Sequence, residues 1–309
     1  MPLLRKKRVL AVKIEATAGT AETLANADVI LDAYECVAQP TIATEARQNQ
    51  GSFDKLPAVP GARMGTISFK VPLTIGTALP SYAARCFPGC GLVPSTNVFQ
   101  PSSEAPGTNV KNVTAALYED GLRKQIHGAA GNVRLVAPSG RMAYLEFEFQ
   151  GAWDSVTDQA LLTVPESTVK PLRFASGTAT YNGVAQKVEQ VTLDMGNTIT
   201  PREDPSRASG YFGALITDRN PTLVANPEAS LVATEDPYGD WIGCTEAAWA
   251  LTLNGASSSS VAIAIPRAQI MNAQEGERSG LDINDITWNA NRNGANNDQD
   301  VSITYTLET

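Results

Sequence analysis

Apolar and polar side chains alternate one by one through several segments of the chain. Residues 66–73, 144–150 and 301–308 all follow this pattern; in the second of them, for example, Phe147 is followed by Glu148. A period of two places apolar side chains on one face of a β-strand and polar side chains on the other. Strands with one packed face and one wet face are typical of antiparallel sheets, so we expect a mainly β protein.

Helical patterns are few and short. Residues 79–90 predict one short helix, which starts after Pro80. Residues 237–248 predict a second one, with Trp241 and Ile242 on its apolar side. Each helix would flank a sheet.

The order of these features repeats along the chain. Each half contains a strand, a polar stretch, a further strand, a short helix and then a hairpin region. The pattern is interrupted around Pro165, Pro171 and Gly177. We therefore expect two tandem β domains of similar plan, one over residues 1–165 with an N-terminal arm and one over residues 166–309.

Charge is distributed unevenly over a chain whose net charge is −8. Residues 1–170 hold 16 Lys and Arg against 15 Asp and Glu, whereas residues 171–309 hold 8 against 17. An acidic chain does not indicate tight binding to DNA, because the phosphates must be neutralised by cations. The basic segment Arg5–Arg8 has two readings: a contact with DNA or a partner subunit, or a solvated arm that orders on assembly.

No catalytic arrangement stands out. The chain has one histidine, His127, and its Gly-rich surroundings at 124–131 indicate a turn within a hairpin. Neither a Walker A motif nor a dinucleotide-binding glycine motif is present. We therefore expect no enzyme activity and no cofactor.

Metal binding is not indicated either. Cys86 and Cys90 have a spacing that suits half a zinc site, but a second ligand pair is missing, so we expect all four cysteines to be free thiols. The Asn- and Asp-rich segment 291–300 lacks the ligand spacing of a calcium loop, and a tight turn explains it more simply. No stretch of about 20 apolar residues or secretory leader is present, so we expect a soluble protein with no membrane partner, made in the cytoplasm.

The order of several short motifs resembles that of the tail tube proteins of long-tailed bacteriophages. The likeness covers nearly the whole chain, and the segments that carry it are Lys13–Thr20, Glu45–Arg47, Cys90–Leu92, Tyr118–Gly121, Gly128–Gly131, Phe147–Gly151, Ile265–Ile270 and Gly280–Ile283. The resemblance implies a structural virion protein whose sheets lie side by side around an axis and close into a β-barrel tube, with a helix outside each sheet. Its implied partners are other copies of itself in stacked rings, the tape measure protein, the tail terminator and the distal tail proteins, with viral DNA passing through during ejection. The suspected repeat favours trimeric rings with pseudo-six-fold symmetry.

Two sets of residues are candidates for function under this reading. Carboxylates that face the lumen would repel DNA phosphates, although the same carboxylates could instead form an outer, solubilising surface; the candidates are Glu146, Glu148 and Glu308. The polar loops at 39–61 and 200–209 are candidates for ring-to-ring contacts, or else mobile hairpin tips. The candidate contact residues in these loops are Arg47, Asp54, Lys55, Arg202, Glu203 and Asp204.

Three other classes of protein compete with the tail tube interpretation. A capsid decoration protein or a tail terminator would form a single ring or trimer and would not stack. A carbohydrate-binding β-sandwich would display clustered aromatic side chains, whereas the four tryptophans of this chain are dispersed.

Overall fold

The computed structural model describes residues 3–308, which form a mainly β protein, as predicted. The first half of the chain contains β1 (Arg8–Ile14), β2 (Tyr34–Gln48), β3 (Lys55–Pro72), α1 (Ser81–Arg85), β4 (Leu92–Ser95), β5 (Val98–Pro101), β6 (Val113–Glu119), β7 (Leu122–Pro138), β8 (Tyr144–Trp153) and β9 (Thr157–Asp158). The second half contains β10 (Thr178–Tyr181), β11 (Val184–Ala185), β12 (Val188–Asp194), β13 (Asn197–Glu203), β14 (Tyr211–Arg219), β15 (Thr222–Pro227), α2 (Pro237–Ile242), β16 (Glu246–Asn254), β17 (Ser260–Arg278), β18 (Leu281–Ala290) and β19 (Ser302–Thr306). Two single-turn 3-10 helices, Asn26–Asp28 and Pro88–Cys90, complete the described elements.

The two halves pair their strands in the same order. Six strands of the first half lie in the antiparallel order β1-β6-β7-β8-β3-β2. Six strands of the second half lie in the antiparallel order β10-β16-β17-β18-β15-β12. Helix α1 follows β3, and α2 follows β15. The short strands β9 and β19 also correspond, because each pairs with the start of the long strand, β7 or β17, on the edge opposite β6 or β16. The structure thus contains one strand plan twice.

The halves are joined into one 17-stranded sheet, with β13 and β14 forming a separate ribbon. Strand β12 of the second half pairs antiparallel with the end of β7, with Leu193 opposite Leu135 and Thr192 opposite Val136. Strand β19 pairs with β5 on another side of the molecule. One apolar cluster extends through both halves, from Phe147 to Trp288. The domain boundary placed at residue 165 falls in the connection between β9 and β10, and it stays a prediction.

The alternation predicted for β8 is confirmed by its burial. Leu145, Phe147 and Phe149 are buried in the core, and Phe147 stacks on Phe69 of β3 with ring centroids 5.2 Å apart. Phe87, in the turn after α1, packs on the same face, with its ring centroid 6.0 Å from that of Phe147. Helix α1 therefore covers the core face of the first half, and the face that carries Glu146 and Glu148 points away from it.

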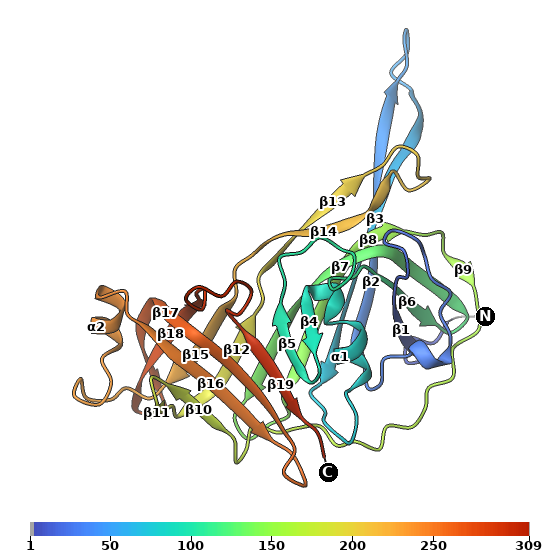
Figure 1. Cartoon of the computed structure of the whole chain (residues 1–309). Coiled ribbons are helices and arrows are strands. Elements are labelled where there is room, and N and C mark those ends of the chain that lie inside the picture. Colours follow the sequence, from blue (N-terminus) through green and yellow to red (C-terminus); the bar gives the residue numbers. More distant parts are fainter. Residues whose placement is uncertain (1–2, 309) are drawn as a thin grey trace.

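The first of the two polar stretches predicted as loops is largely strand, whereas the second is strand only over residues 200–203. Strand β2 continues to Gln48 and β3 starts at Lys55, so residues 40–65 form a hairpin, here called the long arm, with its turn at 49–54. Strands β13 and β14 form a second hairpin at residues 197–219, here called the short arm. Figure 1 shows the long arm standing clear of the body, with the short arm beside its base. Loops were predicted because both faces of the long arm are exposed, so its sequence lacks apolar alternation.

Two further predictions are wrong in detail. Residues 124–131 lie inside β7 rather than in a turn, since the hairpin turn is at Asp120 and Gly121 and a bulge accommodates Gly128. Helix α2 forms, but the side expected to be buried is open: 86% of Ile242 and 37% of Trp241 is exposed.

The four cysteines form no disulfide; Cys36, Cys86 and Cys90 are buried and Cys244 is exposed. Burial raises the pKa of the Cys36 thiol to about 11. Within residues 3–308, both helices are too short to cross a membrane.

Candidate functional site

The tip of the long arm carries three of the residues predicted to act in ring-to-ring contacts. Arg47 lies near the end of β2, Lys55 starts β3, and Asp54 accepts a 2.6 Å hydrogen bond from the Ser52 hydroxyl in the turn. Phe53 stands between them with a fully exposed ring. A bare phenyl ring at the end of a projecting hairpin indicates a contact surface. It was missed because a single Phe in a polar stretch gives no periodic signal.

The other three predicted residues lie on the short arm, and two of them already have partners in the same arm. The Arg202 guanidinium stacks over the ring of Phe212, 4.7 Å from its centroid. Asp204 accepts hydrogen bonds from the Ser206 hydroxyl and backbone N–H, and these hold the pKa of Asp204 below its usual value. Glu203 is exposed at the end of β13. The short arm is therefore internally tied, and its charges are less free than those of the long arm.

The two arms touch at the base of the long arm. The Arg63 backbone N–H donates to the Ser209 carbonyl at 2.8 Å, and the Arg63 guanidinium donates to the Ala208 carbonyl at 3.1 Å. Met64 packs with Ala214 in a small apolar cluster below. The tip of the short arm thus reaches the root of the long arm, so the structure does not bring the two sets of predicted charges together.

The exposed face of the sheet carries a row of alternating charges across four strands. Neighbouring strands place Lys70, Glu146, Arg134 and Asp194 side by side, in that order. Glu146 lies 3.2 Å from the Lys70 ammonium and 3.7 Å from the Arg134 guanidinium. Glu35 pairs with Lys70 from β2 at 2.9 Å, and these carboxylates raise the pKa of Lys70. The charge of Glu146, one of the predicted lumen residues, is thus shared with two cations.

The other two carboxylates predicted to face the lumen differ in setting. Glu148 lies on the same face as Glu146, is exposed and sits opposite Asn132. Six charged groups line a shallow hollow on this face, four acidic and two basic, which gives a local net charge of −2; they are Glu35, Lys70, Arg134, Glu146, Glu148 and Asp194. Glu308 lies elsewhere, beyond the end of β19, where it lines a different hollow with Lys170.

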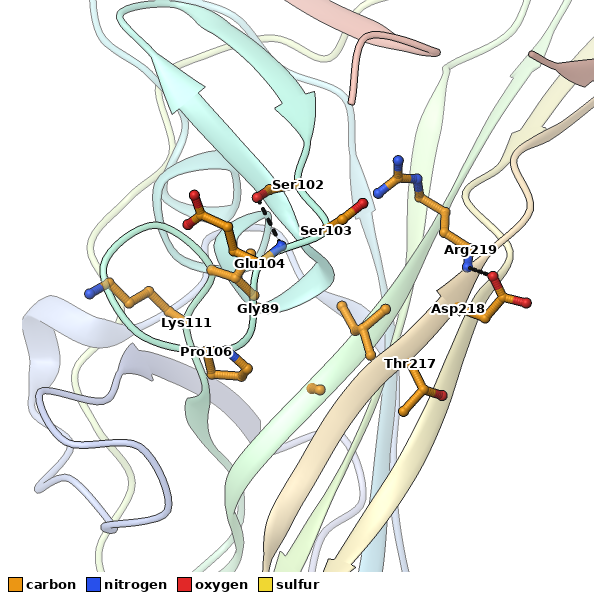
Figure 2. A pocket seen from close by; sticks show the side chains of 12 residues that line it. Gly89, Ser102, Ser103, Glu104, Pro106, Lys111, Thr217, Asp218 and Arg219 are labelled. Atoms are coloured by element: carbon orange, nitrogen blue, oxygen red, sulfur yellow. Dashed lines mark hydrogen bonds between the residues drawn. The ribbon is translucent and has the colours of Figure 1, made fainter. Parts of the chain in front are cut away.

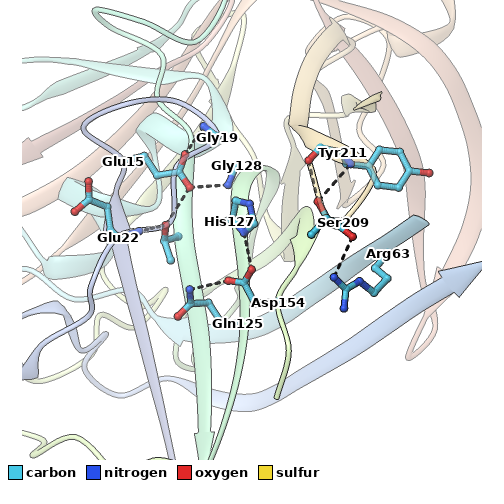
Figure 3. Close-up of polar contacts among 12 residues, drawn as sticks. Glu15, Gly19, Glu22, Arg63, Gln125, His127, Gly128, Asp154, Ser209 and Tyr211 are labelled. Carbon is cyan, nitrogen blue, oxygen red and sulfur yellow. Dashed lines mark hydrogen bonds and ion pairs between the residues drawn. The ribbon is translucent and has the colours of Figure 1, made fainter. Parts of the chain in front are cut away.

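A buried carboxylate joins two of the motifs on which the family resemblance rests. Glu15 accepts hydrogen bonds from the backbone N–H groups of Gly19 (2.7 Å) and Gly128 (2.6 Å) and from the Thr114 hydroxyl (3.0 Å), as Figure 3 shows for the two glycines. Burial raises the pKa of Glu15, although the three hydrogen bonds and His127 oppose the shift. His127 lies beside Asp154, with Nδ1 3.0 Å from Oδ1.

Gly19 and Gly128 also allow the short arm to dock. Both have positive φ, +73° and +57°, and a Cβ at either position would lie 2.7 Å from the Phe212 carbonyl oxygen. Asn112 donates to the Gly128 carbonyl and to the Ala214 carbonyl, both at 3.0 Å. The motifs are therefore explained by a close contact between the first half and β14.

A small hollow of about 190 Å³ lies where the loop after β5 meets the end of β14 (Figure 2). Arg219 at its rim pairs with Asp298 and Asp300, both at 3.3 Å, and Asp298 accepts hydrogen bonds from Ser103. Asp298 and Asp300, the two acidic residues of the 291–300 segment, thus bind an arginine side chain. Among residues 3–308, no group of three or more His, Cys, Asp or Glu side chains is placed to hold a metal ion.

Comparison with known proteins agrees with this architecture. No curated protein matches the chain. A family model described as phage tail tube protein matches residues 6–308, which include both halves and both arms. The chain therefore belongs to the phage tail tube protein family.

Proposed function

We propose that this structural tail protein polymerises as stacked rings into the tube through which the phage ejects its DNA. Three copies per ring, each supplying two equivalent half-sheets, would give pseudo-six-fold symmetry. The tube would meet the tape measure protein inside, and the terminator and distal tail proteins at its ends. The chain would act in the virion tail after assembly in the host cytoplasm, and its role would be non-enzymatic.

The observation that carries this proposal is a repeated sheet with unfinished edges. Within residues 3–308, β2 pairs as a strand only with β3, so its other edge has no strand partner; the Cys36 carbonyl accepts a hydrogen bond from the Arg8 guanidinium. A long unpaired edge is a template for adding another strand, and a closed ring of subunits removes such edges. Exposed strands in the long arm have the same need for partners.

The sheet face opposite the helices is the one that would line the channel. Helix α1 packs on the core side of the sheet, and Glu146 and Glu148 point to the other side. A tube with its helices outside therefore has these carboxylates inside. The alternating row is slightly acidic, so it would offer phosphates few unpaired cations to bind.

The long arm would make the main ring-to-ring contacts. The long arm projects from the body, and Phe53 at its tip has no cover in the chain described. An exposed apolar ring among Arg47, Asp54 and Lys55 would become a small buried anchor with polar surroundings on contact, which suits an interface that forms between folded subunits.

Electron microscopy of the purified chain in negative stain tests the proposal. Hollow tubes of stacked rings are the expected result. Single rings that never stack would point to a decoration or terminator protein instead, and a persistent monomer at high concentration would refute ring formation altogether.

Truncation of the long arm separates stacking from ring closure. Glu45 lies opposite Val59, so residues 46–58 can be replaced by Asn-Gly, which favours a tight hairpin turn. We expect this variant to stay folded and to form rings but no tubes. The control variant is Glu203→Ala on the short arm, which removes an exposed charge and leaves the contacts of Ser206, Arg207 and Ala208 in place; we expect it to stack. Normal tubes from the long-arm variant would contradict the role given to this arm.

A further inference from the structure

The internal repeat indicates how one copy would join the next, if the ring proposed above forms. The central strand β8 lies between β3 and β7, and the central strand β18 lies between β15 and β17. Residues that lie opposite one another across three such strands form a row, and the rows of the two halves can be matched. The matched rows are Phe69–Phe147–Val133 in the first half and Ala225–Ile286–Ala273 in the second. Bulges fall within one residue of the matched positions in β7 and β17 and in β2 and β12, and the match places the buried side chains of Cys36 and Val191 on the same face.

The join between the halves uses one particular edge. Strand β6 pairs with β7 only as far as Ala129, and β12 then occupies the same edge of β7 over residues 134–138. The strand that docks, β12, does so with the edge that faces away from β15. Within the chain, the free edge of β7 in the first half therefore pairs with β12, the end strand of the second half.

The equivalent edge of the second half is open. Strand β16 pairs with β17 only as far as Gln269, and within residues 3–308 no strand pairs with residues 270–278 on that side. The equivalent of β12 is the first part of β2, whose outer edge has no strand partner in the part of the chain that the structure describes; the Arg8 side chain alone reaches it, at the Cys36 carbonyl. One chain thus ends in a free strand on one side and a free acceptor edge on the other.

We propose that β2 of one copy adds to the β17 edge of the next copy, antiparallel, in the register of the β12–β7 join. Matching the rows places residues 36–39 on residues 191–194, and residues 274–277 on residues 134–137. Ala38 would then lie opposite Glu275 of the neighbouring copy, as Leu193 lies opposite Leu135 within the chain. Gln39 would lie opposite Gln274 of that copy, as Asp194 lies opposite Arg134.

Apolar side chains beside the open edge support an interface there. A hollow of about 310 Å³ next to the edge is lined by Val232, Tyr238 and Glu275, so the segment around α2 adjoins the acceptor strand. Val232, Trp241 and Ile242 are all exposed, whereas the equivalent helix α1 buries Tyr82 and Ala83. The first-half helix gains cover from the second half, since the Phe87 ring beside it lies 6.5 Å from that of Tyr305. A neighbouring copy would supply the corresponding cover to α2.

Cysteine pairs test the register directly. In a Cys36→Ala, Cys244→Ser background, the pair Ala38→Cys and Glu275→Cys should form disulfides between copies when assembled protein is oxidised. The control pair, Ala38→Cys with Gly276→Cys, is offset by one residue, which turns one side chain to the opposite face. We expect covalent oligomers on a non-reducing gel from the first pair and little above background from the second.

Amide hydrogen exchange provides a second test, and it uses the protein without any substitution. Residues 36–39 and 274–277 should become protected when monomers assemble, because their edge N–H groups acquire strand partners. Tubes in which neither segment gains protection, or in which both cysteine pairs react alike, would overturn this interface and leave the tail tube proposal standing. Protein that forms neither rings nor tubes would refute that proposal, and this inference with it.

Discussion

Glu15 and Gly128 are joined by a hydrogen bond of 2.6 Å that links the segment after β1 to the bulge in β7. The carboxylate is enclosed beneath the short arm and receives two further hydrogen bonds. It therefore belongs to the contact between the two halves rather than to an exposed surface.

The stability of the unassembled chain should depend on the protonation of Glu15. Burial raises the pKa of Glu15 in the folded state above its ordinary value of about 4.5, so the folded chain holds this proton more tightly than the unfolded chain does. The contribution of Glu15 is then greatest below pH 4.5 and is lost as pH rises through the folded pKa. We expect the free energy of unfolding in urea, wild type minus Glu15→Gln, to fall as pH rises from 4.5. A difference that increases with pH would contradict this sign.

Phe147 should be among the most costly residues to truncate. Its side chain is 2% exposed, stacks with Phe69 and Phe149 and packs at a tilt against Phe87. Phe147→Ala should destabilise the chain by about 3–5 kcal/mol, since it removes apolar contacts and leaves a cavity. The neighbouring Glu148→Ala, on the exposed face, should change stability by less than about 0.5 kcal/mol. Chemical denaturation of both variants measures the contrast.

Arg219 should hold the end of β14 against the 291–300 loop. Its guanidinium is mostly buried between Asp298 and Asp300, and Asp300 itself is 8% exposed. Arg219→Ala should cost about 3 kcal/mol, because it leaves a buried carboxylate without its cation. Arg207→Ala is the matched control: Arg207 pairs with Asp204 at 3.6 Å on an exposed turn, and its loss should cost less than about 1 kcal/mol. Equal thermal shifts in the two variants would argue against the role of Arg219.

The charge of the proposed channel wall can be reversed by two substitutions. Glu146→Lys with Glu148→Lys changes the net charge of the six groups on this face from −2 to +2. Tubes of this variant should retain short DNA duplexes at low salt and release them as salt rises, because each neutralised phosphate adds affinity that depends on salt. The control, Glu146→Gln with Glu148→Gln, brings the net charge to zero and should not retain DNA. Retention that is equal in both variants would show that this face does not meet DNA.

The strands could be predicted where one buried face requires an apolar residue at every second position, as at Leu145, Phe147 and Phe149. The long arm could not, since side chains exposed on both faces leave no alternation in residues 40–65. The bulge at Gly128 was mistaken for a turn, because a glycine with positive φ serves either purpose. Trp241 and Ile242 were expected to be buried because an amphipathic pattern shows that a face needs cover, but not whether the same chain supplies it.

The β12–β7 join within the chain and the proposed β2–β17 join between copies should respond differently to dilution. The join inside the chain closes as a unimolecular event, at an effective concentration that tethering sets on the order of millimolar. Its central pair, Leu135 and Leu193, is fully apolar. A join between chains depends on how much protein is present, and its proposed partners Ala38 and Glu275 include a charge. Newly made subunits would therefore remain monomeric at low concentration and would assemble only when their concentration has risen.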